Sequence, residues 1–282
     1  MYISIKVAYF NTKDIARGFQ IQPEVDSIFG FLLKSLEKSK FLDEENKHLA
    51  YAGRTDYGVN AISQVISFHL NKAFNEIPER FLHRINSRLP INIRCWAYSI
   101  VPNEFHPRFQ ALERHYWYIY TTQVNENLDL TKMIQAGDLL QGTHNFVNFA
   151  KRDTELDNFT RTLNKITIEK INDVFLFKLY AKSFLWQQCR RITAHLIQIG
   201  NGSLDISETY KLLNEINGIT KPTPLPPENL ILTDIIYENI RFTEDRTVKL
   251  KIYQMIDEEL HSIKKKENSL IYFKKLFNKI NF

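Results

Sequence analysis

The chain has 282 residues, about twice the length of a typical single domain, so we expect two domains or one large domain with a substantial core. With 44% hydrophobic and 24% charged residues, it is too apolar for a disordered protein and too polar for a bundle of membrane helices. Lys and Arg number 37 against 32 Asp and Glu, and the resulting net charge of +5 is a weak indication of an acidic partner.

In residues 1–108, segments whose apolar residues alternate, as in strands, are mixed with segments whose apolar residues have helical spacing. A strand is predicted over residues 2–9, and Asp26 or Ser27 is a typical N-cap for the helix that follows. The other elements predicted in this half are a strand at 64–70, a helix at 78–88 and a strand at 94–101.

The second half repeats this mixture. It is predicted to contain strands at 114–121, 165–171, 174–181 and 230–237, with helices at 130–140 and 186–199 and a helix plus loop within 201–227. Because this is no regular strand–helix–strand series, we expect an α+β fold of two similar halves, whose antiparallel sheets flank a central basic cleft. The predicted domains are residues 1–108, residues 109–242 and a basic, helical extension over 243–282.

The extension carries most of the excess positive charge. Residues 264–282 contain six lysines and one acidic residue, Glu267. Clustered lysines are typical of contact with a polyanion such as RNA, but charge alone slightly favours a solvated helix face.

Metal and membrane signals are absent from the sequence. Cys95 and Cys189 are far apart, and there is no CxxC, HxxxH or HExxH pattern, so we expect neither a disulfide framework nor a metal site. The chain starts with a strand pattern, and no run approaches the ~18 apolar residues of a membrane span. These features predict a cytoplasmic protein.

A polar loop, Gly53 to Gly58, separates two apolar segments. Its GxxxxG spacing is similar to that of a phosphate loop, but Val59 and Asn60 follow where Lys and Ser or Thr would be needed. The loop either presents the carboxylate of Asp56 to a cleft or uses that aspartate simply as a turn former.

Residues 53–70, GRTDYGVNAISQVISFHL, resemble the catalytic signature of the TruA-type tRNA pseudouridine synthase family. Further segments that resemble the family occur in its order along the chain: AYFNTKDIARGFQIQP, INSRLP, FHPRFQALERHYWYIY, QGTHNFVNFA, SFLWQQCRRITAHLIQIGNG and LPPENLILTDIIY. The chain departs from the family pattern at Phe10, Asn60 and Asn145, none of which is the aspartate of the signature. The resemblance ends near residue 237.

The resemblance implies an enzyme that isomerises uridine to pseudouridine in tRNA after flipping the base into a pocket, without a cofactor or metal. Asp56 matches the catalytic aspartate, a nucleophile that attacks either the base or the sugar, and Arg190 the basic residue that pairs with it. Tyr116 matches the tyrosine that stacks on the target base. Arg54 would contact phosphate and separate the base from its stack, and Leu230 would close the pocket.

The remaining implications concern partners. The family resemblance implies a homodimer that acts on the 3′ side of the anticodon loop and the adjoining stem of tRNA, and not on DNA. His144 and Cys189 are interpreted as structural. Two alternatives stay open: a non-catalytic RNA-binding protein of the same fold, and a glycoside hydrolase, which would require a second, partnered carboxylate.

Overall fold

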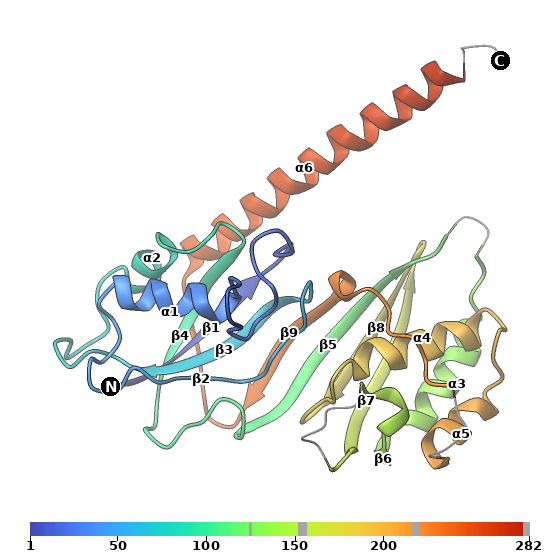
Figure 1. Cartoon of the computed structure of the whole chain (residues 1–282), viewed down its shortest axis with the longest axis horizontal. Helices are drawn as coiled ribbons and strands as arrows, with labels where there is room; N and C mark the ends of the chain where they lie inside the picture. Colours follow the sequence, from blue (N-terminus) through green and yellow to red (C-terminus); the bar gives the residue numbers. More distant parts are fainter. Residues whose placement is uncertain (124–125, 152–156, 216–219, 279–282) are drawn as a thin grey trace.

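The computed structural model describes residues 1–123, 126–151, 157–215 and 220–278. Within these residues ten strands form one large sheet (Figure 1). From one edge to the other the strands are β10 (Thr243–Glu244), β4 (Ile93–Val101), β1 (Tyr2–Tyr9), β3 (Asn60–His69), β9 (Leu230–Tyr237), β5 (Ala111–Thr121), β8 (Val174–Ala181), β7 (Thr160–Ile171) and β6 (Gly142–Asn145), while β2 (Leu49–Tyr51) pairs with β3.

The sheet is mixed in direction but mostly antiparallel. Its parallel pair, β3 with β9, is short, with Asn60 opposite Ile231 and Ala61 opposite Leu232. The strands of the two predicted halves therefore form one continuous sheet instead of two separate ones. The prediction of a mixed α and β fold with mainly antiparallel strands is confirmed.

Two groups of helices pack beside the sheet, and a single hydrophobic core connects them. In Figure 1 the first group lies near β1 and β4, and the second lies beside β7 and β8. The first group is α1 (Ile28–Lys38) and α2 (Phe81–Asn86), and the second is α3 (Leu130–Leu140), α4 (Gln188–Gly200) and α5 (Ser207–Asn214), with the short 3₁₀ turn η1 (Val147–Phe149). A second 3₁₀ turn, η2 (Pro227–Asn229), contacts β3 and β5 in the middle of the sheet.

Local sequence signals account for several boundaries. The hydroxyl of Ser27 accepts a hydrogen bond from the Gly30 N–H and caps α1, so Ser27 and not Asp26 is the cap. The predicted helix at 186–199 begins two residues later, because Gln187 has a left-handed φ of 65°. The short edge strands β6 and β10 were not predicted, since a few exposed residues carry too little alternation.

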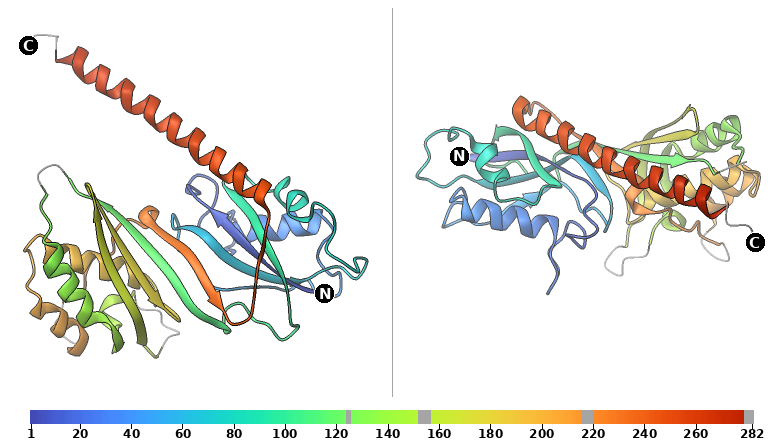
Figure 2. Two further views of the ribbon diagram at one scale, coloured as in Figure 1. Left: turned by 180° about the vertical axis from the view of Figure 1, so that it is seen from behind. Right: turned by 90° about the horizontal axis from the view of Figure 1, so that it is seen from above.

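The last helix, α6 (Arg246–Phe277), has 32 residues and projects from the body of the molecule (Figures 1 and 2). The carboxylate of Asp245 accepts a 3.0 Å hydrogen bond from the Val248 N–H and caps it. Val248 is buried near β4, whereas most of the helix is exposed. Lys279, counted in the basic extension, lies outside the described residues. No helix in the described ranges is long and apolar enough to cross a membrane.

Candidate active site

The loop that carries Asp56 runs from the end of β2 to the start of β3 and is fixed by its neighbours. The Thr55 hydroxyl lies 2.8 Å from the Tyr9 hydroxyl, and the main-chain carbonyl of Thr55 accepts a hydrogen bond from the Phe19 N–H. Gly58 has a left-handed φ of 83°, and a Cβ there would lie 2.8 Å from Cε of Lys13. The loop conformation therefore requires glycine at this position.

Asp56 forms an ion pair with Arg190. The Nη1 atom of Arg190, in the first turn of α4, donates to Oδ2 of Asp56 at 3.3 Å. The Nε atom of the same guanidinium donates to the Leu225 carbonyl at 2.5 Å. Because two bonds hold its plane, the guanidinium has a defined orientation toward the carboxylate.

The carboxylate lies in an environment that favours its neutral form. Burial raises the pKa of Asp56 above its ordinary value, while the charge of Arg190, hydrogen bonds from Trp186 and Arg190, and the charge of Lys151 lower it. The pKa is raised overall because desolvation is the largest of these effects. Perturbed, partly accessible carboxylates of this kind are typical of functional sites, since a raised pKa makes the ionised group a stronger base and nucleophile.

Tyr116 and Leu230 lie on neighbouring strands and share one face of the sheet. Tyr116 is opposite Leu232, and Tyr118 is opposite Leu230. Because directly opposed residues, and residues two apart on one strand, point to the same face, all four side chains lie on one side of the sheet. The Tyr116 ring is buried and makes an edge contact with Phe184 at 5.3 Å between centroids. Burial raises the pKa of Tyr116, and the charge of Asp56 adds to this increase.

Arg54 is on the same loop as Asp56, and its side chain binds Gln20. Its side chain is exposed, and Nη1 donates to Oε1 of Gln20 at 3.0 Å. The structure thus pairs Asp56 with Arg190, places Tyr116 and Leu230 on one face of the sheet, and leaves Arg54 exposed on the loop of Asp56.

Sequence reasoning did not single out Arg114, which is buried two residues before Tyr116. Its guanidinium donates to the carbonyls of Ala52 at 2.7 Å, Arg108 at 2.9 Å, and Lys182. It therefore connects the start of the Asp56 loop, at Ala52, to the segment before β5 and to the residue that follows β8. The available signal was a basic residue inside a strand whose neighbours alternate toward the core.

Trp186 and Lys151 are two further residues that sequence reasoning did not assign to the site. The Nζ atom of Lys151 lies 4.0 Å from the centroid of the Trp186 ring, and the Lys151 N–H donates to the Trp186 carbonyl at 2.9 Å. Both residues affect the pKa of Asp56. Trp186 is 43% exposed, which is unusual for a tryptophan.

Cys189 and His144 were interpreted as structural. Cys189 is buried, and burial raises the pKa of its thiol well above the ordinary value, so the thiol is unsuited to act as a nucleophile near neutral pH. Nε2 of His144 lies 2.8 Å from the Gln141 carbonyl. In the described parts of the chain, no group of three or more His, Cys, Asp and Glu side chains is arranged to hold a metal ion.

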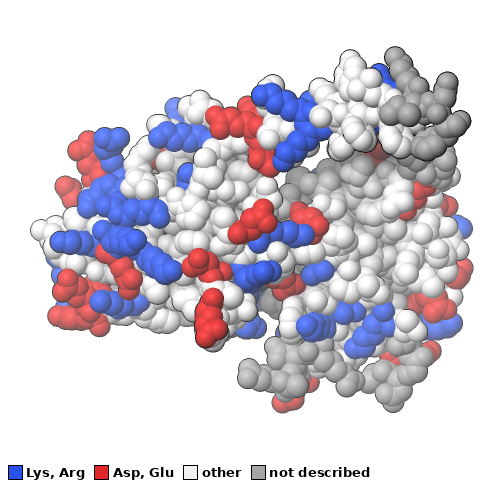
Figure 3. Space-filling model, turned by 45° about the horizontal axis from the view of Figure 1, so that its top comes forward, with Lys and Arg blue, Asp and Glu red and all other residues white. Residues whose placement is uncertain are grey.

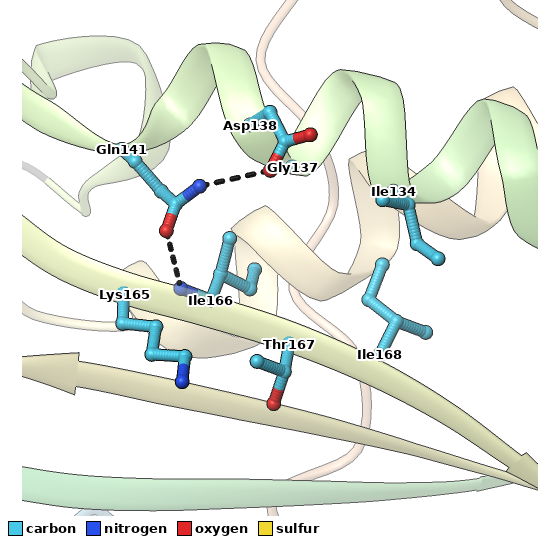
Figure 4. Close-up of a pocket in the computed structure, with 8 residues that line it drawn as sticks. All are labelled: Ile134, Gly137, Asp138, Gln141, Lys165, Ile166, Thr167 and Ile168. Carbon is cyan, nitrogen blue, oxygen red and sulfur yellow. Dashed lines mark hydrogen bonds between the residues drawn. The ribbon is translucent and has the colours of Figure 1, made fainter.

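A pocket of about 370 Å³ between α3 and β7 contains none of the candidate residues (Figure 4). One side of it is closed by Gln141, whose side chain donates to Asp138 and accepts from the Ile166 N–H.

The molecular surface in Figure 3 has basic and acidic side chains interspersed, and the viewed face carries no continuous basic region.

Comparison with known proteins identifies the family. A sequence profile described as tRNA pseudouridine synthase matches residues 136–238. The tRNA pseudouridine synthase A of Methanosphaera stadtmanae is 32% identical over 271 residues, which cover 94% of this chain and 95% of the relative. The enzyme of Methanosarcina acetivorans is 36% identical over 247 residues (87% and 88%), and that of Methanothermobacter thermautotrophicus 33% over 259 residues (91% and 89%).

The chain therefore belongs to the tRNA pseudouridine synthase A family, and the resemblance of its motifs to that family is confirmed. Its activity is isomerisation of uridine to pseudouridine in tRNA. Among solved structures, the match to a chain of an archaeal box H/ACA sRNP complex covers 69% of this chain and 44% of that chain, with 10% sequence identity and a TM-score of 0.33. This TM-score is too low to bear on function.

Proposed function

We propose that this protein forms pseudouridine in the anticodon stem-loop of tRNA, on the 3′ side of the loop and the adjoining stem, with Asp56 as the nucleophile. The observation that carries the assignment of the site is the 3.3 Å pair between Asp56 and Arg190, because it joins two motif residues that are 134 positions apart. A non-catalytic RNA-binding protein would have no need of a carboxylate whose desolvation costs free energy.

The reaction is an isomerisation that a single carboxylate can serve. The bond between N1 of uracil and C1′ of ribose breaks, the uracil turns, and C5 becomes bonded to C1′. The proton on C5 is lost and N1 gains one, so the overall composition is unchanged. Asp56 is the nucleophile in this sequence, and its raised pKa supports that role, since basicity and nucleophilicity of carboxylates increase together.

Arg190 keeps the carboxylate ionised and oriented. An unpaired carboxylate at a desolvated site tends to bind a proton and lose its nucleophilicity, and the nearby guanidinium opposes this. Its second bond, to Leu225, fixes the direction from which it approaches Asp56. Arg190 thus acts on the reaction chiefly through Asp56.

The target uridine must leave its stack to reach Asp56. In our proposal the ring of Tyr116 stacks on the flipped base and Leu230 closes the pocket over it, which the shared face of β5 and β9 supports. Arg54 contacts a phosphate and helps to displace the base, which its exposed position on the catalytic loop supports.

The proposed organisation has two halves, residues 1–108 and 109–242, that enclose a basic cleft with Asp56 at its floor, and an extension at 243–282. This proposal is supported by the meeting of Asp56 from the first half with Lys151, Trp186 and Arg190 from the second. We further propose a homodimer that acts on tRNA in the cytoplasm.

The assignment is tested by mapping pseudouridine in tRNA from cells with and without this protein. We expect pseudouridines on the 3′ side of the anticodon loop and adjoining stem to disappear with the protein and to be restored by purified protein acting on unmodified transcripts. Loss of pseudouridine only outside the anticodon region would contradict the proposed target. Tight tRNA binding without any conversion would favour the non-catalytic alternative.

A further inference from the structure

We propose that the projecting part of α6, residues 260–277, is an arm that binds the tRNA substrate with the side of the helix that continues from Glu259. This inference rests on tRNA being the substrate. It goes beyond the catalytic residues because it assigns a binding surface outside the loop that carries Asp56.

The base of the arm is bonded to the edge of the active site. Nδ2 of Asn11 donates to Oε1 of Glu259 at 3.2 Å, and the Asn11 N–H donates to Oδ1 of Asn60 at 3.0 Å. Asn60 lies four residues after Asp56 and also donates to the Glu228 carbonyl at 2.6 Å. Asn60 is one of the positions at which this chain departs from the family signature, and here it links the catalytic loop to the contact with α6.

The periodicity of the helix shows which residues of the arm lie on the same side as Glu259, the residue that contacts Asn11. Residues seven apart lie about two turns apart in nearly the same direction, which places Ile252, Glu259, Lys266 and Phe273 in one row. Ile252 packs against the core, and Glu259 contacts Asn11. Lys266 and Phe273 are the next members of the row, about 10 Å and 21 Å beyond Glu259 at 1.5 Å per residue.

The composition of the arm fits RNA. Residues 260–277 contain five lysines and one glutamate, a net charge of +4, and their apolar side chains include the exposed rings of Tyr272 (64%) and Phe273 (66%). Lysines bind phosphates with release of counterions, and aromatic rings stack on unpaired bases. A second copy of the chain fits less well, because two arms of equal charge repel each other.

The helix offers matched control variants. At about 100° per residue, Lys266 and Lys274 lie within about 60° of the direction of Glu259, whereas Lys264 and Lys275 lie about 140° to 160° away. The double variants Lys266→Ala/Lys274→Ala and Lys264→Ala/Lys275→Ala remove the same charge from the same helix. Alanine is the best helix former, so neither pair should disturb α6. Phe273→Ala and Tyr272→Ala form a second matched pair for the aromatic rings.

The measurement is the affinity of the full-length protein for unmodified tRNA at several salt concentrations. We expect Lys266→Ala/Lys274→Ala to weaken binding about tenfold at low salt and to reduce the slope of log K against log salt by roughly 1.8, about 0.9 for each lost phosphate contact. The control pair should weaken binding less than threefold. Phe273→Ala should weaken binding more than Tyr272→Ala, because only the former ring lies in the row of Glu259.

Equal effects of the two lysine pairs, or no effect of either, would overturn the assigned side of the arm. A lower molecular mass of the Lys266→Ala/Lys274→Ala variant in sedimentation, with unchanged tRNA affinity, would also overturn it and would identify the surface as an interface between two copies. Pseudouridine formation by the wild-type protein is measured in parallel. Its absence would contradict the proposed function, whereas its presence with unchanged affinities would contradict only the arm.

Discussion

The guanidinium of Arg190 lies 3.3 Å from the carboxylate of Asp56, and its positive charge and the burial of the site shift the pKa of that carboxylate in opposite directions. Burial raises the pKa of Asp56, and Arg190 is the largest influence that lowers it. The balance between the two sets the fraction of protein with an ionised nucleophile, so pH dependence reports directly on the pair.

Replacing Arg190 should shift the acid limb of the pH profile. In Arg190→Gln the pKa of Asp56 rises further, because the opposing charge is lost while burial remains. The active carboxylate forms only above this pKa, so the acid limb of kcat/KM should move to higher pH by roughly one unit or more. The control is Arg191→Gln, whose guanidinium binds Pro222 and Gln187 instead. An acid limb at the same pH in Arg190→Gln and wild type would refute this role.

Arg114 should be important for stability. In Arg114→Met the carbonyls of Ala52, Arg108 and Lys182 lose the donor that Arg114 supplies from its buried position, so the free energy of unfolding should fall by about 2–4 kcal/mol. Urea denaturation monitored by circular dichroism measures this, with the exposed Arg54→Met as the control, expected to change stability by less than about 0.5 kcal/mol. Equal midpoints and slopes for the two variants would show that the hydrogen bonds of Arg114 contribute little.

His195 should make stability depend on pH. It is fully buried, Nε2 lies 2.9 Å from the Thr209 hydroxyl, and burial lowers its pKa to about 4. The unfolded chain binds a proton near pH 6.5, whereas the folded protein does so only near pH 4, so stability should decrease as the pH falls between these values. The loss from this group should reach about 2 kcal/mol at pH 5.

The His195→Gln variant lacks this titration. Comparing the free energy of unfolding at pH 7 and pH 5, we expect the wild type to lose more stability than the variant. The same loss in both proteins would mean that His195 titrates normally in the fold.

Much of the fold could be predicted because periodicity is local information. The strand at 230–237 and the helix at 130–140 are confirmed with the predicted boundaries, since their alternating or helical patterns are long and uninterrupted. Joining of the strands into one sheet was not predicted, because the link between β3 and β9 consists of two residue pairs, starting at Asn60 and Ile231. Such a short pairing leaves no pattern in the sequence.

The site was predictable only to the extent that motifs carry it. The resemblance indicated Asp56 and Arg190, and their contact agrees with that assignment. The role of Arg114 depends on main-chain carbonyls, which every residue has, and so no partner could be identified from side-chain types. The contact of Glu259 with Asn11 joins residues 248 positions apart and likewise has no local signal.

If Asp56 is the nucleophile, all pseudouridine formation depends on its carboxylate, and replacing Asp56 with asparagine should abolish the reaction. Asparagine keeps nearly the same volume but lacks the charge and the nucleophilicity, so binding of tRNA, which depends mainly on phosphate contacts, should change little. The measurement is pseudouridine formed per enzyme in unmodified tRNA by purified protein, with host enzyme excluded by a mock purification. We predict no detectable conversion by Asp56→Asn under conditions where the wild type converts its substrate completely; substantial conversion by the variant would contradict the account.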